Sequence, residues 1–512
     1  MDKIYITTPL YYVNAEPHLG HTYTTVIADT LKRYHIAAGR EAFLLTGTDE
    51  HGDKIAQAAA ANGTTPKEYA DRISALFRST WDECGIAYDH FIRTTDGYHQ
   101  KYVQEVLAKI HQAGDIYFGE YGGFYCYGCE RFYTEKELVD GKCPDHQRAP
   151  EYLSEKNYFF RMSKYQQQLI DAIQRKTDLI RPERYRSEVL AFLREPLEDL
   201  CISRPTSRLQ WGIPLPFDSN YVTYVWFDAL LNYVSALHHR ADGSLQSLWP
   251  KAQHLIAKDI LKPHAIYWPT MLMAAGLELY DHLNVHGYWV MDSGKMSKSL
   301  GNVIRPLEMK ARFGMDAFRY FLLREMAFGQ DANFSEDALI TRINADLANN
   351  LGNFVSRVLA MQQRYFAGIV QPLRESWAED EQHRALRDQF SRAVFDADQF
   401  TGQLQFHRAL ESIWWGLDQA NRYVVQTAPF TLIKDPAKQV RVGEILYHLL
   451  EVLRALARVL APFMPDTAAA LREMLALGDD QMKAPWGEGF KAGHKVNPGR
   501  VLFPRIETEA KK

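Results

Sequence analysis

Two lysines in one short stretch could bind an anion. Lys295 and Lys298 stand three residues apart within residues 292–301, which read Asp-Ser-Gly-Lys-Met-Ser-Lys-Ser-Leu-Gly. Glycines lie on both sides of the pair, and Ser297 and Ser299 add hydroxyl donors. Cationic side chains and hydroxyls in a glycine-flanked loop suit phosphate oxygens, so the stretch predicts a clamp on a phosphate. Taken alone, such a pair of lysines is more often a solvated surface loop.

A second polar cluster lies near the N-terminus, where residues 17–21 read Pro-His-Leu-Gly-His. His18 and His21 stand at the start of a predicted helix, where backbone N–H groups and the helix dipole favour an anion. Gly20 leaves room for a flat base or a ribose to approach the backbone. The alternative is that each histidine only bonds to its own helix end, and the residues alone leave both interpretations open.

A regular framework must hold these clusters. Apolar alternation predicts strands over residues 3–8 and 42–46, and helical patterns follow them over residues 20–39 and 66–84. Strand and helix in alternation predict the α/β class with a doubly wound parallel, Rossmann-type sheet, whose ligands bind outside the carboxyl ends of the strands. Asp49 follows the second strand, where it could hold a substrate ammonium group or cap the next helix.

Strand and helix alternation breaks down over residues 117–224, which predicts an insertion that splits the sheet. Two short knuckles within it offer three thiols and one imidazole: Cys126, Cys129, Cys143 and His146. This spacing is typical of one tetrahedral zinc ion, and four protein ligands leave no open position for catalysis. We therefore expect one structural zinc, against the alternative of thiols that cluster by chance.

Beyond the insertion, the sheet pattern resumes, and only amphipathic helices follow from about residue 337 onward. This organisation predicts an all-α bundle after the split sheet. On its first long helix, Asn353 and Arg357 belong to a polar stripe whose simplest interpretation is a solvated face. Trp414 and Trp415 are expected in the core. The predicted parts are 1–116, the first half of a nucleotide-binding domain; 117–224, the insertion; 225–336, the second half; and 337–512, the bundle with a C-terminal return segment.

The composition is typical of a soluble globular protein, since 46% of the 512 residues are hydrophobic and 24% are charged. No apolar run reaches the roughly 18 residues that a membrane span needs, so we expect no membrane association. The net charge of −4 gives no general signal for nucleic acid. The first residues resemble neither a secretory signal nor a transit peptide, which predicts a cytoplasmic protein.

The tetrad His-Leu-Gly-His at 18–21 and the pentad Lys-Met-Ser-Lys-Ser at 295–299 resemble the two signatures of class I aminoacyl-tRNA synthetases. In that family the two signatures meet across the ATP site, and Mg²⁺ enters with ATP. The resemblance implies two sets of residues. The catalytic set is His18, His21, Lys295 and Lys298, and the ATP-binding set is Gly20, Ser297, Ser299 and Lys298.

Within the class, the chain resembles the methionyl-tRNA synthetases of the bacterial type with a single zinc knuckle site. The resemblance implies ATP-dependent ligation of L-methionine to tRNA(Met) through methionyl adenylate, with release of AMP and diphosphate. A thioether suits aromatic walls, and its sulfur can accept a hydrogen bond from a tyrosine hydroxyl. The implied methionine pocket consists of Leu10, Tyr12, Asp49, Trp226, Ala229, Tyr233, His264 and Tyr267.

The same resemblance implies that the bundle reads the anticodon through Asn353, Arg357 and Phe430. Many relatives carry Trp at the last of these positions, which puts the stacking role of Phe430 in doubt. Many bacterial relatives carry an additional C-terminal tRNA-binding and dimerising domain, which we do not expect here, and we therefore expect a monomer. Two rival functions are a cysteinyl-tRNA synthetase, whose metal must meet the substrate thiol, and a tRNA-binding module without catalysis, which the intact signatures disfavour.

Overall fold

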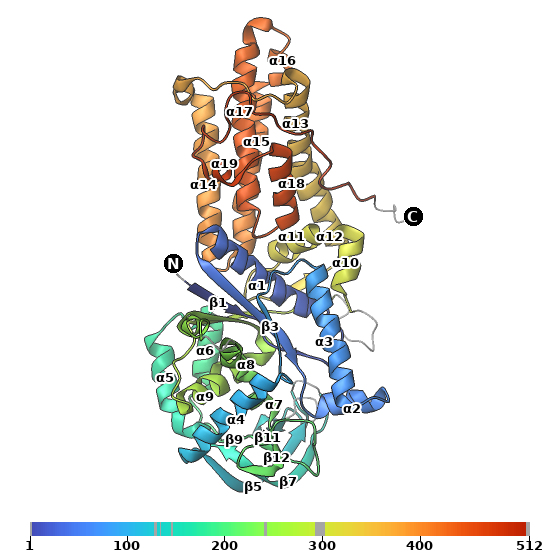
Figure 1. Ribbon diagram of the computed structural model, residues 1–512, viewed down its shortest axis with the longest axis vertical. Helices are drawn as coiled ribbons and strands as arrows, with labels where there is room; N and C mark the ends of the chain where they lie inside the picture. The colour runs from blue at the N-terminus through green and yellow to red at the C-terminus, as the bar shows by residue number, and fades with distance from the viewer. Residues whose placement is uncertain are drawn as a thin grey trace. The chain divides into compact units, whose positions relative to one another are not determined.

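The computed structural model describes residues 3–126, 131–133, 135–144, 147–239, 243–291 and 303–507. The chain forms two compact units, the first from Met1–Lys32 with Gly39–Gly287, and the second from Arg33–Ala38 with Tyr288–Lys512 (Figure 1). Among the described residues, none of the helices combines the length and the apolar character needed to cross a membrane.

A parallel sheet forms the framework of the first unit. Its strands lie in the order β2, β3, β1, β13, β14 and β8, and β4 also pairs with β3. The order reverses at β1, because β3 lies on one side of it and β13 on the other. The predicted doubly wound sheet is therefore confirmed. The strand bounds are β1 (Lys3–Thr7), β2 (Tyr11–Tyr12), β3 (Glu41–Asp49), β4 (His90–Arg93), β8 (Ile180–Arg181), β13 (Ala252–Ala257) and β14 (His282–His286).

Helices connect the strands of the first half of this sheet. The third helix starts sharply because Thr65 and Glu68 form a capping box around Pro66. The predicted helices agree with the observed ones within two residues. The strand predicted over residues 42–46 corresponds to β3, which is longer than predicted and ends at Asp49 itself. The helix bounds are α1 (Leu19–Ala37), α2 (Asp53–Ala61), α3 (Pro66–Glu83) and α4 (Gly97–Gln112).

Antiparallel sheets occupy much of the predicted insertion. One contains β6, β5, β7 and β9 in that order, and the other contains β10, β12 and β11. However, β8 lies within residues 117–224 and pairs with β14, so this part of the range belongs to the parallel sheet instead. The bounds are β5 (Ile116–Cys126), β6 (Arg131–Tyr133), β7 (Glu151–Phe160), α5 (Gln166–Arg175), α6 (Glu183–Phe192), β9 (Leu200–Cys201), β10 (Ser203–Pro205), β11 (Pro214–Leu215) and β12 (Asp218–Thr223).

Short helices lie between the insertion and β14, two of them before β13 and two after it. They are α7 (Val225–Leu230), α8 (Asn232–Ser235), a π-helical segment (Pro263–Tyr267) and α9 (Trp268–Ala274). The π-helical segment inserts an extra residue into a helical turn, a feature that is frequent at functional sites. This segment carries two of the predicted pocket residues, His264 and Tyr267.

Besides Arg33–Ala38, the second unit contains β15 (Trp289–Met291), which pairs with β16 (Ala332–Phe334). Two helices follow and meet at Gly314, whose φ of +82° ends α10 (Pro306–Phe313) before α11 (Met315–Glu325). The remaining helices confirm the predicted bundle. They are α12 (Glu336–Arg342), a π-helical segment (Ile343–Gly352), α13 (Asn353–Phe366), α14 (Glu381–Gly402), α15 (Phe406–Thr427), α16 (Pro429–Leu432), α17 (Gln439–Val459), α18 (Pro465–Leu475) and α19 (Asp479–Lys483).

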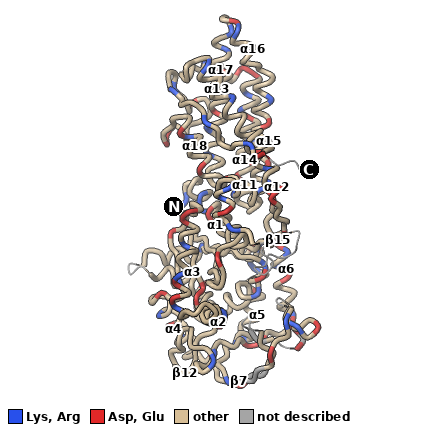
Figure 2. The backbone as a smooth tube through the Cα atoms, turned by 90° about the vertical axis from the view of Figure 1, so that its right-hand side faces the viewer, with Lys and Arg blue, Asp and Glu red and all other residues tan. Residues whose placement is uncertain are grey.

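The bundle core follows the predicted periodicity, since Leu446, Leu449, Leu453 and Leu456 of α17 are fully buried. Basic and acidic residues are interspersed along the chain in both units (Figure 2), in keeping with 59 basic and 63 acidic residues.

Candidate active site

The two histidines of the N-terminal tetrad stack on each other at the start of α1. Their ring centroids lie 3.7 Å apart, and His18 Nδ1 accepts a hydrogen bond of 3.1 Å from the backbone N–H of Gly20. Because Nδ1 is the acceptor, a neutral His18 ring carries its proton on Nε2. A Cβ atom at Gly20 would lie 3.2 Å from the His18 ring, so this glycine keeps the imidazole in place.

Asp49 ends β3 at the carboxyl edge of the sheet, and its side chain is 2% exposed. The short strand β2 pairs with this end of β3, placing Tyr12 opposite Asp49. Val13 N–H donates to the Asp49 carbonyl at 3.3 Å. The Tyr12 ring in turn lies beneath the ammonium group of Lys54, 5.0 Å from its centroid.

Aromatic contacts continue from Tyr12 to the other predicted pocket residues. Trp226 meets the Tyr12 ring edge-on at 6.4 Å and the His264 ring edge-on at 6.0 Å. Tyr233 contacts His264 through its hydroxyl. Tyr267 belongs to the buried core of this unit, and Leu10 packs against that core. Ala229 is also buried. The structure thus joins β2, α7, α8 and the π-helical segment through residues that the sequence placed in one pocket.

The proton positions in this group follow from burial. Burial lowers the pKa of His264 to about 4, so the ring is neutral near pH 7. His264 Nδ1 lies 2.9 Å from the Ile260 carbonyl and must donate to it, which leaves Nε2 to accept the Tyr233 O–H at 2.8 Å. Burial also raises the pKa of Tyr233. The single phenol proton therefore points to His264, which differs from the expectation that a tyrosine hydroxyl here donates to a sulfur.

Asp228 is a buried charge in this region that the sequence did not single out. Its carboxylate is 1% exposed and contacts His51 Nδ1 at 2.6 Å and His99 Nε2 at 2.7 Å. Burial works to raise the pKa of Asp228, but the two imidazoles outweigh it and hold the pKa below its usual range. The contacts tie the residues after Asp49 to the helix that carries Trp226. A charged residue inside an aromatic run was the available signal, since such a residue requires buried partners.

Two of the four predicted zinc ligands lie among the described residues. Cys126 and Cys143 are buried in one small cluster with Tyr133, whose hydroxyl lies 3.4 Å from Cys143 Sγ. Cys129 and His146 lie outside the described residues. Within the described ranges, His, Cys, Asp and Glu form no group of three or more that could hold a metal ion. The two thiols fit the predicted donor set, because both belong to the same buried cluster.

The predicted lysine loop lies outside the described residues, which include neither Lys295 and Lys298 nor Ser297 and Ser299. The described chain stops at Met291, the last residue of β15, and resumes before α10.

The predicted anticodon residues are exposed side chains of the second unit. Asn353 and Arg357 lie on the solvent side of α13, and Phe430 on α16 is 47% exposed. Trp414 is buried and donates to the Asp346 carbonyl at 3.2 Å, as expected for a core residue. Trp415 is 46% exposed, so its expected place in the core is wrong. One residue of helical rotation separates the two indoles and turns the second toward solvent.

Comparison with known families agrees with this arrangement. Residues 4–152 and 146–359 match the family of tRNA synthetases class I (M), and residues 372–512 match the anticodon binding domain of methionyl tRNA ligase. The parallel sheet, the histidine tetrad at a helix start and these matches define a class I aminoacyl-tRNA synthetase.

Comparison with individual relatives identifies the family within this class. The methionine–tRNA ligase of Caldanaerobacter subterraneus subsp. tengcongensis is 45% identical over 99% of this chain and 79% of its own length. That of Streptomyces coelicolor is 42% identical over 98% of this chain and 96% of its own length. A crystal structure of Mycobacterium tuberculosis methionyl-tRNA synthetase bound by methionyl-adenylate matches with a TM-score of 0.92 and 37% identity, covering 98% of this chain and 100% of that one. The chain belongs to the methionyl-tRNA synthetase family.

Proposed function

We propose that the chain activates L-methionine with ATP and transfers it to tRNA(Met). The reaction forms methionyl adenylate with release of diphosphate, and transfer to tRNA releases AMP. The observation that carries this proposal is the likeness, over nearly the whole chain, to a synthetase bound by methionyl-adenylate. The matched anticodon-binding domain supports tRNA as the acceptor.

In the proposed first step, the methionine carboxylate attacks the α-phosphorus of ATP, and the bond to diphosphate breaks. The carboxylate is itself the nucleophile, so the protein supplies position and charge. His18 and His21 stabilise the phosphates from the start of α1, with Lys295 and Lys298 as the cationic partners. Mg²⁺ that accompanies ATP neutralises part of the phosphate charge.

The proposed substrate contacts divide by chemistry. Asp49 binds the methionine ammonium group, because a buried carboxylate at the sheet's carboxyl edge favours a cation. Gly20, Ser297 and Ser299 contact ATP. The side-chain pocket for the thioether consists of Leu10, Tyr12, Trp226, Ala229, Tyr233, His264 and Tyr267. Their contacts, described above, support this assignment.

A structural zinc ion is proposed on the knuckles, held by Cys126, Cys129, Cys143 and His146. Three thiolates and one imidazole form a closed tetrahedral set that would stabilise this small cluster. Metal analysis of the purified protein should find about one zinc per chain. Cys143→Ser should lower the zinc content and destabilise the knuckles, and full zinc content in this variant would contradict the assignment.

For the second unit, we propose anticodon recognition through Asn353 and Arg357, with stacking of a base on Phe430. The exposure of all three side chains supports contact with a large partner. The four predicted parts, 1–116, 117–224, 225–336 and 337–512, remain our assignment of roles, apart from β8. We further propose a monomer that acts in the cytoplasm, and light scattering of the pure protein tests its oligomeric state.

Exchange of pyrophosphate into ATP, run with each of the twenty amino acids, tests the proposed activity. Methionine should support exchange, and the other amino acids should support far less. Exchange with cysteine would favour the rival synthetase, and the absence of exchange with every amino acid would favour a binding module.

A further inference from the structure

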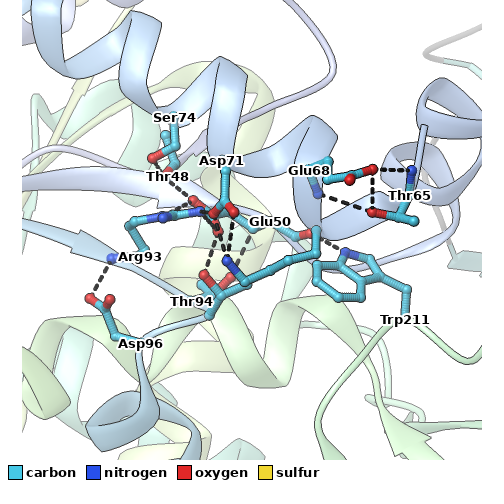
Figure 3. A network of polar contacts seen from close by, with 12 residues as sticks. Thr48, Glu50, Thr65, Glu68, Asp71, Ser74, Arg93, Thr94, Asp96 and Trp211 are labelled. Carbon is cyan, nitrogen blue, oxygen red and sulfur yellow. Dashed lines mark hydrogen bonds and ion pairs between the residues drawn. The ribbon is translucent and has the colours of Figure 1, made fainter. Parts of the chain in front are cut away.

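A buried polar network centred on Glu50 surrounds the end of β3 (Figure 3). The Glu50 side chain is 0% exposed and forms a bidentate ion pair with Arg93. Arg93 Nε donates to Oε1 at 2.7 Å, and Nη2 donates to Oε2 at 2.8 Å. The hydroxyls of Thr48 and Thr95 donate to the same carboxylate at 2.7 and 2.6 Å. A buried carboxylate is stable only when its lone pairs are satisfied, and here two hydroxyls and a guanidinium satisfy them.

The backbone of Glu50 is fixed as firmly as its side chain. Its N–H donates to Thr94 Oγ1 at 3.0 Å, and its carbonyl accepts the indole N–H of Trp211. Two residues later, Gly52 N–H donates to the Trp211 carbonyl at 3.2 Å. The segment directly after Asp49 is therefore held between β4 and the region around Trp211.

The network continues from Arg93 to the surface of α3. Arg93 Nη2 also donates to Asp71, which accepts two hydrogen bonds of 2.7 Å from Lys67. Thr48 adds a second link to α3, because its hydroxyl lies 2.8 Å from that of Ser74. The network thus anchors both neighbours of Asp49 to the same helix.

Thr48 and Asp49 are the last two residues of β3, and neighbouring side chains on a strand point to opposite sides. Because Thr48 faces the network, Asp49 faces the other side, and Glu50 returns to the network directly after the strand ends. We propose that Glu50 and Arg93 are positioning residues that fix the direction of the Asp49 carboxylate toward the substrate ammonium group. This inference rests on the proposed role of Asp49. Neither residue contacts the substrate in this scheme, and both act through the backbone at residue 49.

Two methionine analogues separate positioning from general damage. Methioninol keeps the ammonium group and lacks the carboxylate, whereas 4-(methylthio)butanoate keeps the carboxylate and lacks the ammonium group. Each is measured as an inhibitor of methionine-dependent pyrophosphate exchange. In Glu50→Gln, we expect the Ki of methioninol to rise about tenfold and that of 4-(methylthio)butanoate to change less than about twofold.

Two further variants, one test and one control, are compared with Glu50→Gln. Arg93→Lys keeps the positive charge but loses the bidentate contact with Glu50. It should therefore also raise the Ki of methioninol, by a smaller factor than Glu50→Gln does. Glu68→Gln is the matched control, because it makes the same chemical change in the exposed capping box of α3, where glutamine also caps. Neither Ki should change in this control.

An equal rise of both Ki values in folded Glu50→Gln would overturn the inference, as would an unchanged Ki for methioninol. Circular dichroism checks the fold, and if Glu50→Gln does not fold, Arg93→Lys is judged by the same two criteria. Asp49→Asn separates the two proposals. If it leaves the methioninol Ki unchanged, the proposed role of Asp49 fails. If it raises that Ki while Glu50→Gln does not, the role of Asp49 stands and the positioning inference fails.

Discussion

Each unit of the molecule contains a buried tyrosine that is hydrogen-bonded to a neutral histidine. In the first unit the tyrosine is the donor, and in the second unit the histidine is the donor. In the first unit, His264 Nε2 accepts the proton of Tyr233, because Nδ1 donates to a backbone carbonyl. In the second unit, the guanidinium of Arg441 donates to His383 Nε2, so the Nδ1–H of His383 donates to the Tyr423 oxygen at 2.6 Å. Burial lowers the pKa of both histidines to about 4.

Burial and a shifted pKa therefore do not by themselves identify a functional residue. The His383 ring centroid lies 4.3 Å from that of His448, with the rings tilted by 37°, and Trp486 donates to His448 Nδ1 at 3.1 Å. These contacts join elements within the bundle. His264 instead follows β13, near the carboxyl edge where parallel sheets bind ligands. Location in the fold is therefore our reason for proposing His264, and not His383, as a pocket residue.

The largest expected contrast is in catalysis. His21→Asn should lower the pyrophosphate exchange rate about 10²–10³-fold, because it removes a donor that we propose stabilises the phosphates in the transition state. His383→Asn makes the same change in the bundle and should leave the rate per folded molecule unchanged. Initial rates corrected for folded fraction provide the measurement, and equal losses in the two variants would remove the contrast.

Acid should weaken the second unit. Burial lowers the pKa values of His383 and His448 to about 4 and about 3, whereas histidine in an unfolded chain titrates at about 6.5. Below about pH 6.5 the unfolded chain binds protons that the folded chain does not, so stability is complete above that pH and falls toward pH 4. We expect a loss on the order of 3 kcal/mol between about pH 7 and about pH 5.

Urea unfolding followed at several pH values measures this loss. His448→Phe removes one of the two groups, so its unfolding free energy should depend less steeply on pH than that of the unchanged protein. An equally steep dependence would show that the two histidines do not cause it.

Removing one hydroxyl from each tyrosine tests the comparison directly. Tyr233→Phe leaves an imidazole acceptor without its donor in the proposed pocket, so the KM for methionine should rise about fivefold. Tyr423→Phe leaves the Nδ1–H of His383 without its acceptor, so it should cost about 1–3 kcal/mol of stability and leave the KM unchanged. Exchange kinetics and thermal unfolding of both variants are the measurements, and a reversed pattern would contradict the assignment.

The smallest expected effect is an absence of pH dependence. Because burial lowers the pKa of His264 to about 4, this ring stays neutral between about pH 6 and about pH 8. Its titration should therefore not change the KM for methionine across that range. A step in KM near pH 6.5 that disappears in His264→Gln would show that the ring titrates there instead.

Local patterns predicted the parallel sheet, the first helices and the bundle because each of these elements is long enough to repeat its period. The two-residue strand β8 is too short to show alternation, so its pairing with β14 could not be foreseen. Gly314 was the visible signal for the break between α10 and α11, since glycine adopts a positive φ without strain.

For the site, the sequence offers predictions where residues carry a recognisable spacing, as in the histidine tetrad and the knuckles, and the chemistry assigned to them stays a prediction. The partners of Asp228 and Glu50 could not be predicted, because His99 and Arg93 are distant from them in sequence and only the fold brings them close. The direction of the Tyr233 proton also depends on a backbone carbonyl that no side-chain pattern encodes.

That proton has a consequence for inhibitor design. With its hydrogen donated to His264, the Tyr233 oxygen has only lone pairs left for a ligand in the pocket that we propose. A compound that replaces the thioether with a hydroxyl or an amide N–H could donate to this oxygen without disturbing the imidazole. A compound that presents an acceptor at the same place would have to compete with His264 for the proton, and its affinity should suffer accordingly.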